Sequence, residues 1–170
     1  MTKVSHKYAM NAICSKLVVK IEERYKMGNV MAVCKSEKKG TQKQNIGTGF
    51  FKVDHGLVGD AHAGNWHRQV SLLSFDKIED FRAKGAEVGH GAFGENLVVA
   101  GIDFKTLPIG THLRCNEVEM EVTQIGKECH SHCEIYKVMG DCIMPREGVF
   151  AKILHEGEIT VGDTLQVVAE

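Results

Sequence analysis

The stretch Glu117-Val118-Glu119-Met120-Glu121-Val122-Thr123 alternates strictly between polar and apolar residues. Because successive side chains of a β-strand point to opposite faces, this alternation predicts a strand with one buried face. Close behind it, residues 126–142 contain three of the six cysteines, Cys129, Cys133 and Cys142, and two of the nine histidines. The sequence therefore predicts a β scaffold that presents reactive groups on the segment following one of its strands.

Short apolar runs elsewhere in the chain are also typical of strands. Glycines recur between residues 46 and 64, where they permit tight turns and argue against long helices. One helix is predicted after Ser74, which is placed to cap its N-terminus, and Gly85 is placed to end it. Because strands outnumber helices, the predicted fold class is mostly β, of the β-barrel-like or α+β type, with a few helices. The other predicted strands are residues 30–33, 70–73, 97–99, 149–154 and 164–168, with a strand pair within 111–123.

Residues 1–28 predict a separate helical extension at the N-terminus. Apolar residues recur there at three- and four-residue spacing from Met10 to Tyr25, mostly with charged residues between them. We expect this appended helix to cover one side of the domain or a partner subunit. Residues 29–170 are expected to form one domain, because no linker-like tract interrupts them.

The composition limits the class of protein. A chain of 170 residues with 43% hydrophobic content can bury a core, and its net charge of −1 provides no basic field for nucleic acid or an anionic membrane. No apolar run approaches the roughly 18 residues of a membrane-spanning helix. The first ten residues also lack the apolar core of a signal peptide. We therefore expect a cytoplasmic protein with no nucleic-acid or membrane partner, while its oligomeric state stays open.

Cysteines in a chain without a secretion signal are expected to be mostly reduced thiols. Cys14, Cys34 and Cys115 stand singly in mixed or apolar surroundings. We interpret these three as small buried hydrophobic residues, because unpaired cysteine is commonly buried.

The clustered cysteines Cys129, Cys133 and Cys142 have three interpretations. A lysine and two histidines nearby would favour the thiolate, which is the nucleophilic and metal-binding form. Three thiols and two imidazoles could also hold a structural zinc ion, although the spacings lack the paired short knuckles of common zinc modules. The third interpretation is that these cysteines are buried and have no chemical role. The residues alone leave the three interpretations open.

A glycine-rich turn carries a second group of candidates. Within Gly59-Asp60-Ala61-His62-Ala63-Gly64, the carboxylate of Asp60 and the imidazole of His62 can bind a ligand, order a water or simply cap the turn. Arg68 follows soon after, and its planar guanidinium suits phosphate or carboxylate.

A polar pair follows the second glycine-rich stretch. Glu95 and Asn96 enter a predicted buried strand, so they need hydrogen-bond partners, and they either hold neighbouring loops together or face a ligand. Residues 35–44, in contrast, are polar with a glycine among them, and they predict an exposed loop.

These motifs, taken in order, resemble the MOSC domain, a module named after the C-terminal part of molybdenum cofactor sulfurases. The resemblance covers about residues 29–168 and leaves the N-terminal helix outside it. It rests on Gly56-Leu57-Val58-Gly59-Asp60-Ala61-His62-Ala63-Gly64, Arg68-Gln69-Val70-Ser71-Leu72-Leu73, Gly91-Ala92-Phe93-Gly94-Glu95-Asn96-Leu97, Gly101, Ile109-Gly110, Val122-Thr123-Gln124 leading to a cysteine, and Gly162-Asp163.

The resemblance implies a β-barrel-like MOSC fold and a link to the molybdenum cofactor, molybdopterin. Family members are thought to carry sulfur as a cysteine persulfide or to bind the cofactor with a thiolate on molybdenum. The implied function is cofactor binding or sulfur carriage, by a sulfur transferase or a molybdenum-dependent oxidoreductase if the protein is an enzyme. The implied partners are cofactor-biosynthesis or sulfur-donor proteins. The alternatives are a zinc-stabilised module without catalysis and a reductase component acting on N-hydroxylated substrates.

The resemblance also suggests roles for single residues. Counting from Thr123 makes Cys129 the family cysteine, whereas matching the residues that follow it makes Cys133 that cysteine. Either would be the reactive thiol and the molybdenum ligand, and Cys142 would resolve a persulfide as a disulfide. The proline or arginine usual before this cysteine is absent here. The implied cofactor site further contains Asp60, His62, Arg68, Glu95 and Asn96.

Overall fold

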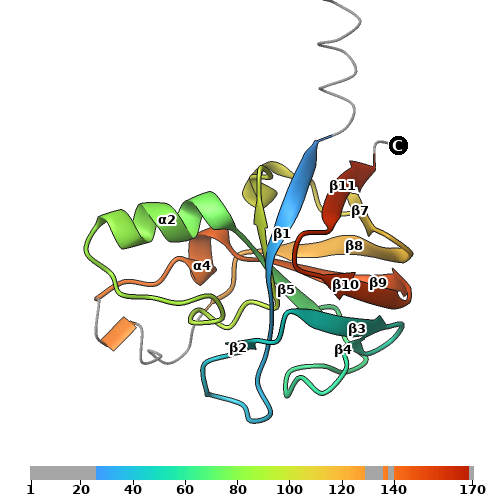
Figure 1. Cartoon of the computed structure of the whole chain (residues 1–170), viewed down its shortest axis with the longest axis horizontal. Helices are drawn as coiled ribbons and strands as arrows, with labels where there is room; N and C mark the ends of the chain where they lie inside the picture. Colours follow the sequence, from blue (N-terminus) through green and yellow to red (C-terminus); the bar gives the residue numbers. More distant parts are fainter. Residues whose placement is uncertain (1–25, 129–135, 138–139, 169–170) are drawn as a thin grey trace, which may run out of the picture.

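The computed structural model describes residues 26–128, 136–137 and 140–168 of the chain. Within this part, seven strands form a closed barrel in the order β11-β7-β8-β9-β5-β6-β1, and the pairing of β1 with β11 closes it (Figure 1). The predicted β-barrel-like fold class is thereby confirmed. The barrel strands are β1 (Met27–Lys35), β5 (Val70–Ser74), β6 (Leu97–Ala100), β7 (His112–Cys115), β8 (Val118–Ile125), β9 (Val149–His155) and β11 (Thr164–Val168).

The strand predicted from the alternating stretch is β8. Its residues Val118, Met120 and Val122 are fully buried inside the barrel, while the glutamates between them are half-buried. β8 pairs antiparallel with β7 on one side and with β9 on the other. The apolar residues of the alternating stretch therefore lie on the buried face of β8 and the polar residues on its outer face, as predicted.

A small second sheet closes one part of the barrel. It consists of β10 (Gly157–Thr160), β3 (Thr48–Lys52) and β4 (Gly56–Leu57), in that order. The side chains of Phe51, Leu57 and Ile159 from this sheet belong to the same buried cluster as the barrel interior. The glycine-rich region thus forms short strands and tight turns, as predicted. The two-residue strand β2 (Gln44–Asn45) pairs antiparallel with the end of β1.

The predicted helix after Ser74 is α2 (Phe75–Ala83), which connects β5 to β6. Because β5 and β6 pair in parallel, this connection is a β-α-β crossover, which the sequence pattern had not indicated. Ser74 occupies the predicted N-cap position, but its side chain makes no capping hydrogen bond: its hydroxyl donates to the carbonyl of Ile102 at 2.7 Å and accepts from the amide of Phe104 at 3.2 Å. Ser74 therefore ties β5 to the segment after β6 instead of capping the helix.

A second apolar cluster lies outside the barrel wall, beneath α2 and α4 (Met144–Glu147), which stand on the same side of the barrel (Figure 1). Cys34 and Cys142 belong to this cluster, whereas Cys115 belongs to the barrel interior. Burial raises the pKa of the Cys34 and Cys115 thiols to about 12. The interpretation of these two cysteines as buried hydrophobic residues is confirmed, while Cys14 lies outside the described residues.

The first barrel strand is longer than the strand predicted at residues 30–33. β1 begins at Met27, so Gly28 is part of the strand, and residues 1–25, which carry the predicted helix, lie outside the described residues. In the described part of the chain, no helix combines the length and apolar character needed to cross a membrane.

Gly28 offers a test of how tightly the barrel is closed. A Cβ atom at this position would lie 2.4 Å from the Ala100 carbonyl oxygen and 2.7 Å from Val99 Cγ1. Because backbone would have to move, Gly28→Ala should lower the free energy of unfolding by about 1–3 kcal/mol, measured by urea denaturation. Gly89→Ala is the matched control, since a Cβ there meets no described atom within 4 Å. Equal stability of the two variants would contradict the packing of β1 against β6.

Candidate functional site

A cavity of about 100 Å³ lies where segments distant in the sequence meet beside the barrel. The strands β1, β6, β5, β9 and β8 are consecutive neighbours in the barrel, so the segments adjoining them can gather on one side. The polar and aromatic side chains that line the cavity include Lys43, His62, Trp66, Arg68, Asn96 and Lys127. The cavity is therefore rich in positively charged groups.

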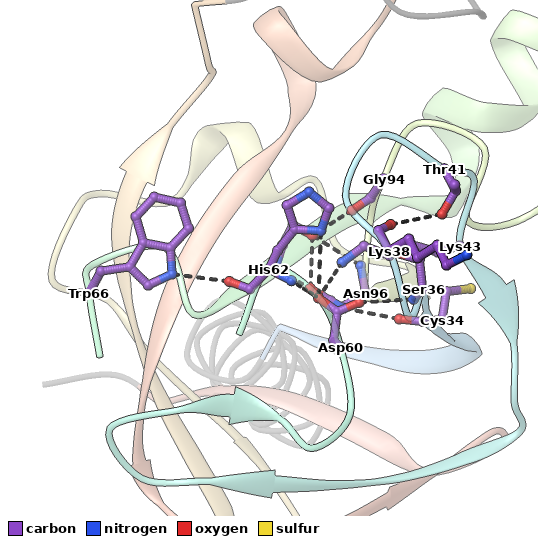
Figure 2. Close-up of polar contacts among 11 residues, drawn as sticks. Cys34, Ser36, Lys38, Thr41, Lys43, Asp60, His62, Trp66, Gly94 and Asn96 are labelled. Carbon is purple, nitrogen blue, oxygen red and sulfur yellow. Dashed lines mark hydrogen bonds and ion pairs between the residues drawn. The ribbon is translucent and has the colours of Figure 1, made fainter. Parts of the chain in front are cut away.

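A buried ion pair forms the back of this site (Figure 2). Lys43 Nζ donates to Asp60 Oδ2 at 2.9 Å, and each of the two side chains is only 1% exposed. Asp60 also accepts from the amide of Ser36 at 3.0 Å and from the amide of His62 at 3.2 Å. Burial tends to raise the pKa of Asp60, but Lys43 and the amide hydrogen bonds outweigh it and hold this pKa below its usual value. Asp60 thus joins the loop after β1 to the loop after β4.

The prediction of an exposed loop at residues 35–44 is wrong for two residues. Ser36 and Lys43 are buried, whereas Glu37 to Gln42 are exposed. Burial lowers the pKa of Lys43, and the neighbouring Asp60 carboxylate opposes that change. Sequence reasoning missed Lys43, because nothing local distinguishes one buried lysine from its solvated neighbours in a polar stretch.

Asn96 holds three barrel strands together at the cavity. Its Oδ1 accepts from the amide of Ser71 at 3.1 Å and from the Ser71 hydroxyl at 3.0 Å, and its Nδ2 donates to the carbonyl of Cys34 at 3.0 Å. These bonds join β6, β5 and β1. Because its amide is committed to this framework, Asn96 shapes the cavity wall that it lines.

Glu95 lies behind the cavity wall and does not line it. Its carboxylate is fully buried and accepts from the amides of Gly91 at 2.6 Å and Phe93 at 3.0 Å. Burial raises the pKa of Glu95 to about 7, even though these hydrogen bonds favour the charged form. Gly91 has a φ of +87°, and a Cβ there would lie 2.2 Å from the Lys43 carbonyl oxygen. Glu95 therefore holds a turn that packs directly against the backbone of Lys43.

Arg68 contacts two aromatic rings at the cavity. Its guanidinium carbon lies 4.6 Å from the centre of the Trp66 ring and 5.6 Å from the centre of the Phe150 ring. Among the described residues its buried Nε has no hydrogen-bond partner. Stacking fixes the plane of the guanidinium while leaving donors available for a ligand.

Lys127 enters the cavity from the end of β8. The preceding Gly126 donates its amide to the Gly148 carbonyl at 2.7 Å, and a Cβ on Gly126 would lie 2.5 Å from the Pro145 carbonyl oxygen. The end of β8 is therefore packed closely against α4. Lys127 precedes Cys129 by two residues in the sequence.

Of the three candidate thiols, the structure describes only Cys142. Cys129 and Cys133 lie outside the described residues. Cys142 is buried in the apolar cluster that also contains Ile143 and Met144. No group of three or more histidine, cysteine or acidic side chains able to hold a metal ion occurs among the described residues.

The predicted cofactor residues separate into two groups. His62, Arg68 and Asn96 line the cavity, as does Lys127. Asp60 and Glu95 lie behind it, where they fix Lys43 and the turn at residues 91–94. The arrangement is chemically suited to hold an anionic group, because cations and unpartnered nitrogen atoms face the same small space.

Comparison with known proteins gives consistent results. A family model of the MOSC domain matches residues 59–166. The uncharacterized protein YflK of Bacillus subtilis is 27% identical over 86 residues, which cover 48% of this chain but only 39% of YflK. The structure is similar to that of the YuaD protein of Bacillus subtilis, with a TM-score of 0.71 and 16% identity over 84% of this chain and 96% of YuaD. It is also similar to YiiM of Escherichia coli, with a TM-score of 0.57 and 18% identity over 86% of this chain and 70% of YiiM. At these identities the structural likeness concerns the fold.

Because Lys43 and Asp60 form a buried ion pair, the effects of substituting each residue on the free energy of unfolding should be strongly non-additive. Lys43→Met leaves the Asp60 carboxylate buried without its cation and should lower the free energy of unfolding by about 3–5 kcal/mol. The double variant Lys43→Met/Asp60→Leu removes both charges and should be more stable than Lys43→Met alone. Urea unfolding of both single variants and the double variant checks this cycle. Additive losses would contradict a coupled ion pair.

Because the pKa of Glu95 is raised in the folded protein, its contribution to stability should depend on pH. Its pKa rises from 4.5 to about 7 on folding, so its contribution is full below the lower value and is lost as the pH rises through the upper one. In Glu95→Gln the amide group places an N–H donor opposite a backbone donor, which should be destabilising. The stability advantage of the wild type over Glu95→Gln should therefore shrink from about pH 5 to about pH 8. Unfolding free energies across this range test it, and an advantage that grows with pH would contradict the burial of this carboxyl group.

Proposed function

This chain belongs to the MOSC domain family, which is associated with molybdenum cofactor-related functions, and from that membership we propose that it binds the cofactor and carries sulfur for it. In this proposal the cationic cavity holds an anionic part of the cofactor. A cysteine from the segment that follows β8, Cys129 or Cys133, supplies the thiol.

The observation that carries the proposal is the convergence of Lys43, Arg68 and Lys127 on one small cavity. The charge of Lys43 is compensated by Asp60. For Arg68 and Lys127, the described residues provide no ion-pair partner. Two uncompensated cations beside a half-buried histidine attract an anion, and the guanidinium fork matches phosphate oxygens.

The size of the cavity limits which part of the cofactor it can take. Its volume of about 100 Å³ is well below the roughly 300–1,000 Å³ of pockets that enclose a whole drug-sized ligand. The cavity therefore suits a single phosphate group of the cofactor, which Arg68 and Lys127 would hold. The unpartnered Nε of Arg68 is the donor that fits such a group.

The sulfur chemistry is assigned to the thiol near Lys127. Positive charge nearby favours the thiolate, which attacks the terminal sulfur of a donor protein's persulfide. A new S–S bond then forms on this chain, the donor's S–S bond breaks, and the donor leaves as a thiolate. When bound, the molybdenum cofactor supplies a metal centre with affinity for soft sulfur ligands. The chain's own cations hold the anionic group, and the thiol delivers or ligates sulfur.

The cofactor arm of the proposal predicts an effect of Arg68. Arg68→Leu should reduce the molybdenum and pterin content of the protein purified from a cofactor-producing host by at least about tenfold, because it removes the bidentate donor. Arg114→Leu is the matched control, since Arg114 is exposed on β7 and pairs with Glu119. Retention of both contents in Arg68→Leu would contradict cofactor binding in this cavity.

The thiol arm uses Cys129→Ser and Cys133→Ser, with Cys115→Ala in the barrel core as control. One of the two serine variants should lose persulfide labelling, while the control should keep it. Labelling that survives in both serine variants would contradict the assigned thiol. Elemental analysis completes the test: stoichiometric zinc that disappears with these cysteines, accompanied by unfolding, would instead favour a zinc-stabilised module.

A further inference from the structure

His62 stands in the cavity with its backbone fixed and its ring free to meet a ligand. Its amide donates to Asp60 Oδ2 at 3.2 Å, and its carbonyl accepts from the indole nitrogen of Trp66 at 3.2 Å (Figure 2). The ring lines the cavity and is 39% exposed. Its Nδ1 is buried and has no hydrogen-bond partner among the described residues. Among the described residues, the ring therefore makes no hydrogen bond that a ligand would have to break.

The carboxylate of Asp60, which lies near His62, already accepts hydrogen bonds from other groups. Asp60 Oδ2 lies 3.9 Å from His62 Nδ1, beyond hydrogen-bonding distance. That same carboxylate accepts from Lys43 Nζ and from two backbone amides. Asp60 is therefore committed to the framework, and although its carboxylate lies within ion-pair distance of a protonated His62, none of the described residues accepts a hydrogen bond from the ring.

The other charged groups that face His62 are cations from several segments. Lys39 and Lys43 come from the loop after β1, and Lys127 comes from the end of β8. Arg68 lines the same cavity. Burial, and then the charge of Lys43, lower the pKa of His62, while Asp60 opposes them. Without a bound anion, His62 is therefore mostly neutral at neutral pH.

Binding of an anion in the cavity favours the protonated form of His62 instead of the neutral form. The anion lies between the cations and the imidazole, so it compensates the positive charges and offers an acceptor to a ring N–H. A doubly charged oxyanion gains most, because Arg68 and Lys127, which have no ion-pair partner among the described residues, supply two positive charges and a protonated His62 supplies a third.

We propose that His62 makes this cavity selective for dianionic tetrahedral groups by taking up a proton when such a group binds. This inference rests on the proposed function, because it requires the cavity to bind anions. It assigns to His62 a role in ligand binding, as a donor that is charged in the complex and neutral in the free protein. The ligand class is a phosphate monoester or a similar dianion.

Sulfate is a suitable probe, because it stays dianionic over the pH range in which histidine titrates. Its dissociation constant is measured by titration calorimetry from about pH 5.5 to about pH 8.5. Affinity should fall as the pH rises, by up to about tenfold per pH unit where one proton is taken up. Calorimetry in buffers of different ionisation enthalpy should show proton uptake on binding.

His62→Gln keeps a polar side chain but cannot titrate in this range, so its sulfate affinity should be weak and independent of pH. His67→Gln and His112→Gln are the controls. The ring of His67 pairs with Gln124 at 3.0 Å, and that of His112 pairs with Glu119 at 3.0 Å on β7. Both controls should keep the pH dependence of the wild type.

The outcomes separate the two proposals. Sulfate binding in the wild type that does not vary with pH, or a pH dependence that persists in His62→Gln, overturns the role of His62 and leaves the anion cavity intact. If His67→Gln loses the pH dependence, then His67 and not His62 takes up the proton, and the inference is also overturned. If the wild type binds no sulfate at any pH, the anion cavity itself fails, and the role of His62 fails with it.

Discussion

The ion pair between Lys43 and Asp60 is the constraint on which the site depends. Removing two charges from water is unfavourable by several kcal/mol for each ion, so such a pair persists only when its geometry is good and its remaining hydrogen bonds are satisfied. The geometry of the pair is good, and the Asp60 carboxylate is satisfied, because it accepts from two backbone amides in addition to Lys43 Nζ. The pair thereby joins the loop after β1 to the loop after β4, together with the backbone hydrogen bond from the amide of Ala61 to the carbonyl of Ser36.

The other contacts around the cavity support this pair. Glu95 fixes the turn at residues 91–94, and Gly91 allows that turn to lie against the carbonyl of Lys43, where a side chain would not fit. Asn96 then joins β6 to β5 and β1 directly below. The result is a rigid wall on which Arg68, Lys127 and His62 can present charge without rearranging, which is how a small site achieves affinity.

Local patterns predicted the scaffold well and the site only in part. The alternation of β8, the run 164–168 that forms β11, and the helix that became α2 are local signals, and each was confirmed. The glycine motifs pointed to Asp60, His62 and Asn96, which the fold brings together. Lys43 could not be predicted, because its burial depends on a carboxylate 17 residues away in the sequence. The capping hydrogen bond predicted for Ser74 is absent for a similar reason, because the Ser74 hydroxyl donates to the carbonyl of Ile102, which is distant in the sequence.

We propose that the cavity beside the barrel is an anion site organised by the buried pair of Lys43 and Asp60. The most direct measurement is a crystal structure of the full chain with selenate, whose anomalous scattering marks the position of a tetrahedral dianion. We expect one strong anomalous peak in the cavity, in contact with Arg68 and Lys127 and in front of the Lys43–Asp60 pair. A cavity that holds only water at saturating selenate, with the anion bound elsewhere or not at all, would contradict it.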